Sequence, residues 1–122
     1  MAAPVLYGIA NCDTVKKARA WLAARGCDHA FHDFKREGLP AALLDEWIAV
    51  LGVQELVNRK GTTWRRLDDK QRAAADGDGA ARVLLLAQPS LVKRPVVRWI
   101  GGVLTVGFDP ARFAAELARA RR

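Results

Sequence analysis

The chain has 122 residues, of which 51% are hydrophobic and 27% charged, which is typical of one globular domain and excludes a disordered or membrane protein. No apolar run reaches the roughly 20 residues of a membrane span, and the start lacks signal-peptide features. We therefore expect a cytoplasmic protein with no membrane partner. Two cysteines, Cys12 and Cys27, are too few for a disulfide framework and lack zinc-ligand spacing, so we expect reduced thiols and no metal.

The net charge of +7 comes entirely from the second part of the chain. Residues 1–50 hold six basic and six acidic side chains, whereas residues 51–122 hold fourteen basic and seven acidic ones. This bias permits binding of nucleic acid or anionic substrates. Part of it is the terminal run Arg119, Arg121 and Arg122, which fits a solvated helix end. The tryptophans fit core packing better than base stacking, so we do not expect nucleic acid as a partner.

Residues 5–34 predict a strand, a helix and a second strand. Val5–Ile9 is a short β-prone apolar run that ends at a turn signal. Apolar side chains recur at helical spacing over Thr14–Arg25, and Gly26 ends that helix. The following stretch, CDHAFHDF, forms the second strand, and the crossover requires a parallel pair. The carboxyl end of the first strand therefore points at Cys12.

A helical insertion follows, at about residues 39–90. Pro40 opens a helix with one apolar face, and Gly52 closes it. Residues 57–61 form a polar connection that carries Arg59. The DGDG loop and the break at Pro89-Ser90 then delimit two more helices, predicted at 69–75 and 80–88.

The chain returns to strands and ends in a helix. Residues 96–100 and 103–106 are strand-like, and the two glycines between them suit a tight hairpin turn. The final helix begins at Asp109-Pro110. The order is βαβ, helical insertion, ββα, which predicts an α/β fold with a mixed four-stranded sheet. No linker suggests a second independent domain, so we expect residues 1–122 to form one domain.

Cys12 is the first candidate for chemistry. It lies two residues before the predicted helix, where free N–H groups and the helix dipole lower the pKa of a thiol. Loops at this edge of an α/β sheet commonly meet ligands. Asp13 would raise the thiol pKa and Lys16 and Lys17 would lower it, so the sign of the shift stays open, as does an inert cysteine. Val15 stands where a CxxC motif needs its second cysteine, so a second thiol must come from outside.

Two arginines are candidates for binding an anion beside Cys12. Arg94 precedes Pro95, which keeps it extended beside the sheet edge, and Arg59 lies in the polar loop. Guanidinium groups that converge on a thiolate would stabilise it and bind an oxyanion or a carboxylate. The alternative is that both arginines are ordinary surface residues. Asn11 and Thr14 would supply loop polarity or helix capping.

Five stretches, YGIANCDTVKKARAWL, FHDFKREGL, NRKGTTWR, LVKRPVV and VGFDPARF, together resemble the arsenate reductase (ArsC) family. The similarity is greatest to its small YffB-like branch, related to the Spx regulators. It runs nearly the full chain and implies a thioredoxin-like fold, in which Pro95 matches an active-site proline that is often cis. Cys12 matches the cysteine that attacks arsenate, and Arg59 and Arg94 match two arginines that bind the oxyanion. Glutathione and glutaredoxin complete that reaction in the arsenate reductases.

Two positions depart from the arsenate reductases. Their histidine four residues before the cysteine is Gly8 here, and their third arginine falls at residues 106–108. Losing one guanidinium would weaken oxyanion binding roughly ten- to a hundredfold. The resemblance therefore favours a glutathione-dependent thiol oxidoreductase with Cys12 as nucleophile, and arsenate reduction is the alternative activity. We expect a monomer without a tightly bound cofactor, whose partners are glutathione, a glutathionylated or oxyanion substrate, and glutaredoxin.

A binding module is the remaining alternative. The Spx relatives regulate transcription by binding RNA polymerase. They generally carry a CxxC switch at this position, which Val15 removes here. This regulator would have no enzymatic activity.

Overall fold

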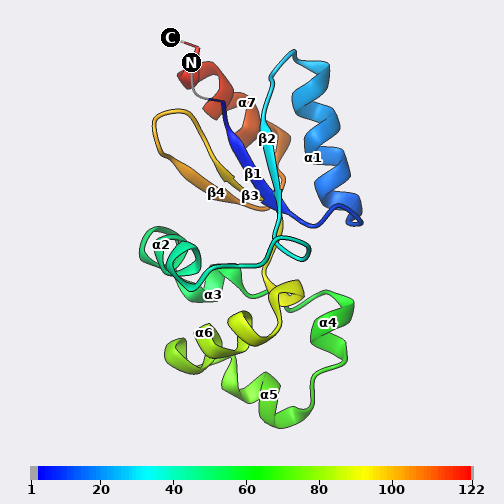
Figure 1. The fold of residues 1–122 in the computed structure, drawn as a ribbon, viewed down its shortest axis with the longest axis vertical. Helices are drawn as coiled ribbons and strands as arrows, with labels where there is room; N and C mark the ends of the chain where they lie inside the picture. Colours follow the sequence, from blue (N-terminus) through cyan, green and yellow to red (C-terminus); the bar gives the residue numbers. More distant parts are fainter. Residues whose placement is uncertain (1–2, 122) are drawn as a thin grey trace. The chain divides into compact units, whose positions relative to one another are not determined.

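The computed structural model describes residues 3–121, which divide into two compact units (Figure 1). The first unit joins the chain up to Glu37 with the chain from Arg94 onward, and the second is Gly38–Lys93. The expectation that the whole chain forms one domain stays a prediction. No helix within residues 3–121 is both long and apolar enough to cross a membrane. Met1 and Ala2 of the start, and Arg122 of the basic run, lie outside the described residues.

A four-stranded sheet with the order β2-β1-β3-β4 forms the centre of the first unit. Strands β1 and β2 pair in parallel, and β3 is antiparallel to both β1 and β4. The predicted mixed four-stranded sheet is therefore confirmed. The strands are β1 (Val5–Gly8), β2 (Ala30–Asp33), β3 (Val96–Arg98) and β4 (Leu104–Val106).

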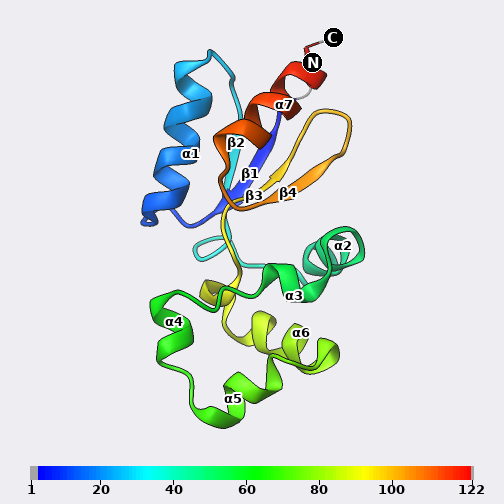
Figure 2. The ribbon, with the colours of Figure 1, turned by 180° about the vertical axis from the view of Figure 1, so that it is seen from behind.

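Two helices, α1 (Asp13–Ala24) and α7 (Pro110–Ala120), pack on one face of this sheet. Helix α7 lies behind the strands in Figure 1 and in front of them in Figure 2. Both helices have an apolar stripe at helical spacing, and the stripes meet strand residues in one core. The buried members of this core are Leu6, Val15, Ala18, Leu22, Val97, Trp99, Phe113 and Leu117.

A glycine marks the C-terminal end of α1, and an aspartate marks the N-terminal end of α7. The N–H of Gly26 donates to the carbonyl of Ala23 at 3.0 Å, and that of Cys27 donates to Leu22 at 2.9 Å. With Gly26 at a φ of 65°, these bonds form a Schellman motif that ends α1. The carboxylate of Asp109 accepts the Ala111 N–H at 3.0 Å and caps α7.

Strand β2 begins at Ala30, later than predicted, and the hairpin is wider than a two-residue turn. Trp99 donates its N–H to Val103 at 2.8 Å, and its carbonyl accepts the N–H of Gly102 at 2.9 Å. Strand β3 therefore ends at Arg98. The reason is the buried indole of Trp99, which bonds the Thr105 hydroxyl at 3.0 Å and so fixes the start of the turn.

The second unit is helical. Its helices over 41–51, 69–74 and 78–87 agree with the predicted positions, except that α6 begins inside the DGDG loop. Single-turn elements α3, α4 and η1 escaped prediction because they are too short to show a helical period. The elements are α2 (Ala41–Leu51), α3 (Val53–Leu56), α4 (Thr62–Arg65), α5 (Asp69–Ala74), α6 (Asp78–Ala87) and the 3₁₀ turn η1 (Pro89–Leu91).

Candidate functional site

Cys12 is the N-cap residue of α1. It has an extended backbone, with φ −136° and ψ 122°, and its carbonyl accepts the first helical bond from Lys16 at 2.9 Å. The side chain is partly exposed. The sulfur therefore stands at the helix N-terminus, where a negative charge is favoured.

The surroundings of Cys12 lower the pKa of its thiol below the ordinary 9.0. Burial acts in the opposite direction and raises it. The backbone N–H of Val15, the hydrogen bond and positive charge of Arg94, and the N–H of Thr14 together outweigh burial. The sequence left open whether the pKa of Cys12 is raised or lowered. In the structure it is lowered, by the N–H groups at the start of α1 and by Arg94.

Arg94 and Pro95 lie in the same unit as Cys12, at the start of β3. The Arg94–Pro95 peptide bond is cis, and Pro95 is buried. The carbonyl of Pro95 accepts the N–H of Gly107 at 2.8 Å. Residues 106–108 therefore run beside the Arg94–Pro95 bond, with apolar and glycine residues where the arsenate reductases have an arginine. The ring of Phe108 packs 4.9 Å from that of Phe113.

Arg59 belongs to the second unit, where other groups engage its guanidinium. It donates to the Gln54 side chain at 2.6 Å and to the carbonyl of Ala75 at 3.5 Å. It also pairs with Asp76 at 3.8 Å and lies over the ring of Trp64, 5.5 Å from its centroid. These contacts link the loop after α3 to the end of α5. A role for Arg59 beside Cys12 stays a prediction.

The other two predicted positions flank the sulfur in sequence. Asn11 is exposed in the loop before Cys12. Thr14 is exposed in the first turn of α1, and it acts on the thiol through its backbone N–H. The N-cap of α1 is Cys12 itself, and a role for Asn11 and for the Thr14 hydroxyl as loop polarity or helix capping stays a prediction.

The second cysteine, Cys27, is also partly exposed, but its position and the direction of its pKa shift differ from those of Cys12. Cys27 lies beyond the opposite end of α1, and both thiols are free among residues 3–121. Burial raises the pKa of Cys27, and Asp28 adds to this, whereas Arg121 opposes it. Cys27 is therefore the less nucleophilic thiol at neutral pH.

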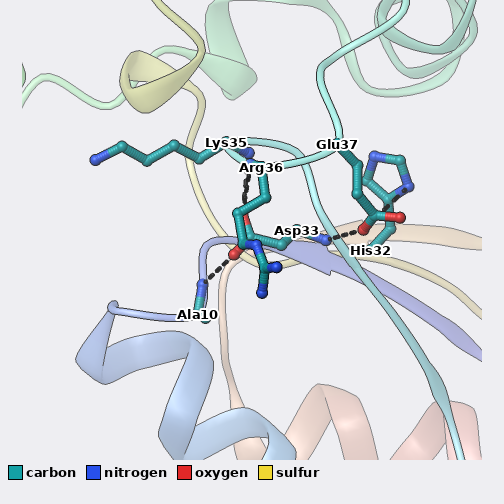
Figure 3. A network of polar contacts seen from close by, with 6 residues as sticks. All are labelled: Ala10, His32, Asp33, Lys35, Arg36 and Glu37. Atoms are coloured by element: carbon teal, nitrogen blue, oxygen red, sulfur yellow. Dashed lines mark hydrogen bonds and ion pairs between the residues drawn. The ribbon is translucent and has the colours of Figure 1, made fainter.

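Asp33, at the end of β2, is a residue near the site that was not predicted from the sequence. Its side chain is buried, with 7% exposed. Figure 3 shows its carboxylate between two loops: one oxygen accepts the N–H of Ala10 at 3.1 Å, and the other accepts those of Lys35 and Arg36 at 3.0 and 3.2 Å. The signal was an acidic residue at the last position of a strand, directly before a turn.

A mixed sheet, a cysteine at the start of its first helix and a neighbouring arginine before a cis proline together define a thioredoxin-like protein. The ArsC family model matches residues 7–115. The chain belongs to the ArsC family, a family of thiol oxidoreductases and arsenate reductases. The predicted family and fold class are confirmed.

Several relatives resemble nearly the whole chain. An uncharacterized protein of Haemophilus influenzae is 40% identical over 113 residues, 93% of this chain and 97% of that protein. The structure of a YffB protein is 48% identical with a TM-score of 0.84, covering 94% of this chain and 99% of that one. An arsenate reductase (ArsC) related protein from Brucella melitensis is 47% identical with a TM-score of 0.75, covering 95% of both chains. An arsenate reductase from Vibrio cholerae, 19% identical with a TM-score of 0.72 and covering 93% of this chain and 97% of that one, shares the fold.

Proposed function

We propose that the protein is a glutathione-dependent thiol–disulfide oxidoreductase in which Cys12 is the single nucleophile. The observation that carries this proposal is the position of Cys12, partly exposed at the start of α1, where Arg94 and the N–H groups of Val15 and Thr14 lower its pKa. A thiolate attacks a disulfide, whereas a thiol does not. The lowered pKa favours the ionised, reactive form of the sulfur.

The reaction proceeds in two thiol–disulfide exchanges. The Cys12 thiolate attacks the glutathione sulfur of a mixed disulfide R–S–S–G, which forms the bond between Cys12 and glutathione and releases R–S⁻. The thiolate of a second glutathione then attacks the glutathione sulfur on Cys12. This step releases the Cys12 thiolate and forms oxidised glutathione, one half of which comes from the mixed disulfide. Each reduction of R–S–S–G to R–SH therefore consumes one reduced glutathione.

External glutathione is required because this chain supplies no internal resolving thiol near Cys12. Cys27 lies beyond the far end of a twelve-residue helix, about 18 Å long at 1.5 Å per residue. Val15 occupies the position of the second cysteine in a CxxC motif. Arg94 is the group in the same unit that would bind a carboxylate of glutathione.

Mass spectrometry tests the proposal directly. The reduced protein, incubated with oxidised glutathione, should gain one glutathione on Cys12. The Cys12→Ser variant should gain none, and Cys27→Ser should behave as the wild type. Turnover of a glutathionylated peptide with reduced glutathione should likewise require Cys12. The absence of an adduct on the wild type would refute the proposal.

Arsenate reduction is a second candidate, favoured by the contact of Arg94 with Cys12. Gly8 and residues 106–108 argue against it, because the resemblance places a histidine and a third oxyanion-binding arginine of the arsenate reductases at these positions. We expect arsenate with glutathione and glutaredoxin to give no turnover above a Cys12→Ser control. Turnover that depends on Cys12 and arsenate would establish this activity instead.

The same adduct experiment separates an enzyme from a regulator that binds RNA polymerase. A regulator would capture purified polymerase in a pull-down and form no adduct at Cys12. For the enzyme we expect the adduct and no retention of polymerase.

A further inference from the structure

We propose that Asp33 is a positioning residue for Cys12. Its carboxylate holds the loop between β1 and α1 and so keeps the Cys12 sulfur beside Arg94 and the first N–H groups of α1. Asp33 acts on the sulfur through Ala10. The link between this positioning and turnover rests on the proposed function, whereas the positioning itself concerns only the Cys12 thiol.

The geometry makes Asp33 a bridge between the two loops at one end of the sheet. Asp33 pairs with Gly8 in the register of β1 and β2, and the N–H of Phe34 donates to the carbonyl of Gly8 at 3.0 Å. From this anchored position one carboxylate oxygen reaches Ala10, two residues before Cys12, at 3.1 Å. The bond therefore fixes the loop midway between the end of β1 and the sulfur.

The other oxygen fixes the carboxylate itself. It accepts the N–H groups of Lys35 and Arg36 at 3.0 and 3.2 Å, and the N–H of Asp33 donates to Glu37 at 2.9 Å (Figure 3). These bonds fix the backbone and the carboxylate of Asp33, so the side chain loses little further rotational freedom when it binds Ala10. The bond to Ala10 therefore restricts the motion of the Cys12 loop.

The N–H donors around Asp33 and the charge of Arg36 favour its ionised form. Burial raises the pKa of Asp33, but the N–H groups of Ala10, Arg36 and Lys35, together with the charge of Arg36, lower it below the ordinary 3.8. Glu37 faces it from the turn, and His32 Nδ1 lies 4.0 Å from the Glu37 carboxylate. At neutral pH Asp33 is therefore an acceptor-only carboxylate, which suits three N–H donors.

For the variant Asp33→Asn, a positioning role and a purely electrostatic role of Asp33 predict opposite changes in the pKa of the Cys12 thiol. Asp33→Asn removes a negative charge, and by charge alone this would lower the pKa of the Cys12 thiol. If Asp33 positions the loop, the variant raises that pKa, because one amide oxygen cannot serve both loops and the sulfur moves from its stabilising groups. The direction of the change thus identifies the mechanism.

The experiment uses the full chain with Cys27→Ser as background. The pKa of Cys12 is measured by ultraviolet thiolate absorbance, and its alkylation by iodoacetamide is timed at neutral pH. We expect Asp33→Asn to raise the pKa and slow alkylation about fivefold, the factor corresponding to one hydrogen bond. Asp33→Ala should act more strongly. Glu37→Gln, which removes a nearby carboxylate but leaves the Ala10 bond, is the matched control and should not raise the pKa.

An unchanged or lowered Cys12 pKa in Asp33→Asn, with native circular dichroism, would overturn the inference. The nearly isosteric asparagine variant carries the test if Asp33→Ala does not fold. The two proposals also fail separately. A wild-type glutathione adduct with no pKa change in Asp33→Asn refutes positioning alone. A raised pKa in Asp33→Asn with no adduct on the wild type refutes the proposed function alone.

Discussion

The side chain of Val15 fills the space that a side chain at Gly8 would need. A Cβ at position 8 would lie 2.7 Å from Cγ2 of Val15, closer than Cβ atoms approach other carbons, and 3.2 Å from Cγ1, which is a tight contact. Val15 is itself 1% exposed and part of the main core of the first unit. The site therefore has no room for the histidine that the arsenate reductases carry at this position.

We expect Gly8→Ala to destabilise the protein by about 1–3 kcal/mol, the usual cost of overpacking a core. Urea unfolding measures this change. Gly79→Ala is the control, because a Cβ there meets no atom within 4 Å and alanine favours a helix. In a Val15→Ala background the Gly8→Ala change should cost less. An equal cost in both backgrounds would show that the two side chains do not compete for space.

The two cysteines should react over different pH ranges. The lowered pKa of Cys12 and the raised pKa of Cys27 predict that alkylation of Cys12 reaches its plateau at lower pH. Mass spectrometry of peptides after timed iodoacetamide treatment follows each residue separately. Overlapping profiles would contradict the assignment of the reactive thiol.

The lowered pKa of Cys12 also makes the free energy of unfolding depend on pH. Because folding lowers the pKa, ionisation of Cys12 stabilises the folded state fully only above the ordinary 9.0. This contribution is lost as the pH falls through the folded value. The stability difference between wild type and Cys12→Ser, measured by urea unfolding, should therefore shift in favour of the wild type as the pH rises.

Arg94 should be the side chain on which the Cys12 thiolate depends most. Replacing Arg94 by alanine removes a charged hydrogen bond to the sulfur, so the Cys12 pKa should rise and alkylation at neutral pH should slow about tenfold. Arg94→Lys keeps the charge and should lose less. Arg25→Ala removes an equal charge near the opposite end of α1 and should leave the rate unchanged. Equal alkylation rates in Arg94→Ala and the wild type would show that Arg94 does not stabilise the Cys12 thiolate.

Arg59 should contribute to the stability of the helical unit. Its bonds to Gln54 and to the carbonyl of Ala75 predict that Arg59→Ala costs about 1–2 kcal/mol in urea unfolding. A simultaneous rise in the Cys12 pKa would support the second role predicted for Arg59. Gln54→Ala removes the bond to Arg59, together with the bonds of Gln54 to Ala75 and Asp78, but keeps the guanidinium of Arg59. It therefore separates the stability effect from an effect of the Arg59 charge. Unchanged unfolding of Arg59→Ala would contradict the stabilising role.

The sequence predicted the elements with strong periodicity and missed those defined by contacts distant in the chain. Thr14–Arg25 has both an apolar stripe and a terminal glycine, so α1 could be predicted almost to the residue. The end of β3 could not, since it depends on the buried bond from Trp99 to Thr105. Single-turn helices such as α4 leave too short a pattern to detect.

The candidate site was predictable to a similar extent. A cysteine between a strand and a helix can be found from local sequence alone, and so can an arginine before a proline. The sign of the Cys12 pKa shift could not, because it depends on an N–H of Val15 and on Arg94 from the far end of the chain. Asp33 was missed because its donor Ala10, which links it to the Cys12 loop, becomes a neighbour only when β1 and β2 pair.

The sulfur of Cys12 occupies the place where most helices carry a serine or an aspartate, and this governs how easily its covalent adducts are reversed. A sulfur that is stable as an anion is a good leaving group. A disulfide to Cys12 takes that anion away from the amides of α1 and from Arg94, so its cleavage restores favourable interactions. We therefore expect a disulfide at Cys12 to have a comparatively high reduction potential and to be cleaved readily by other thiols.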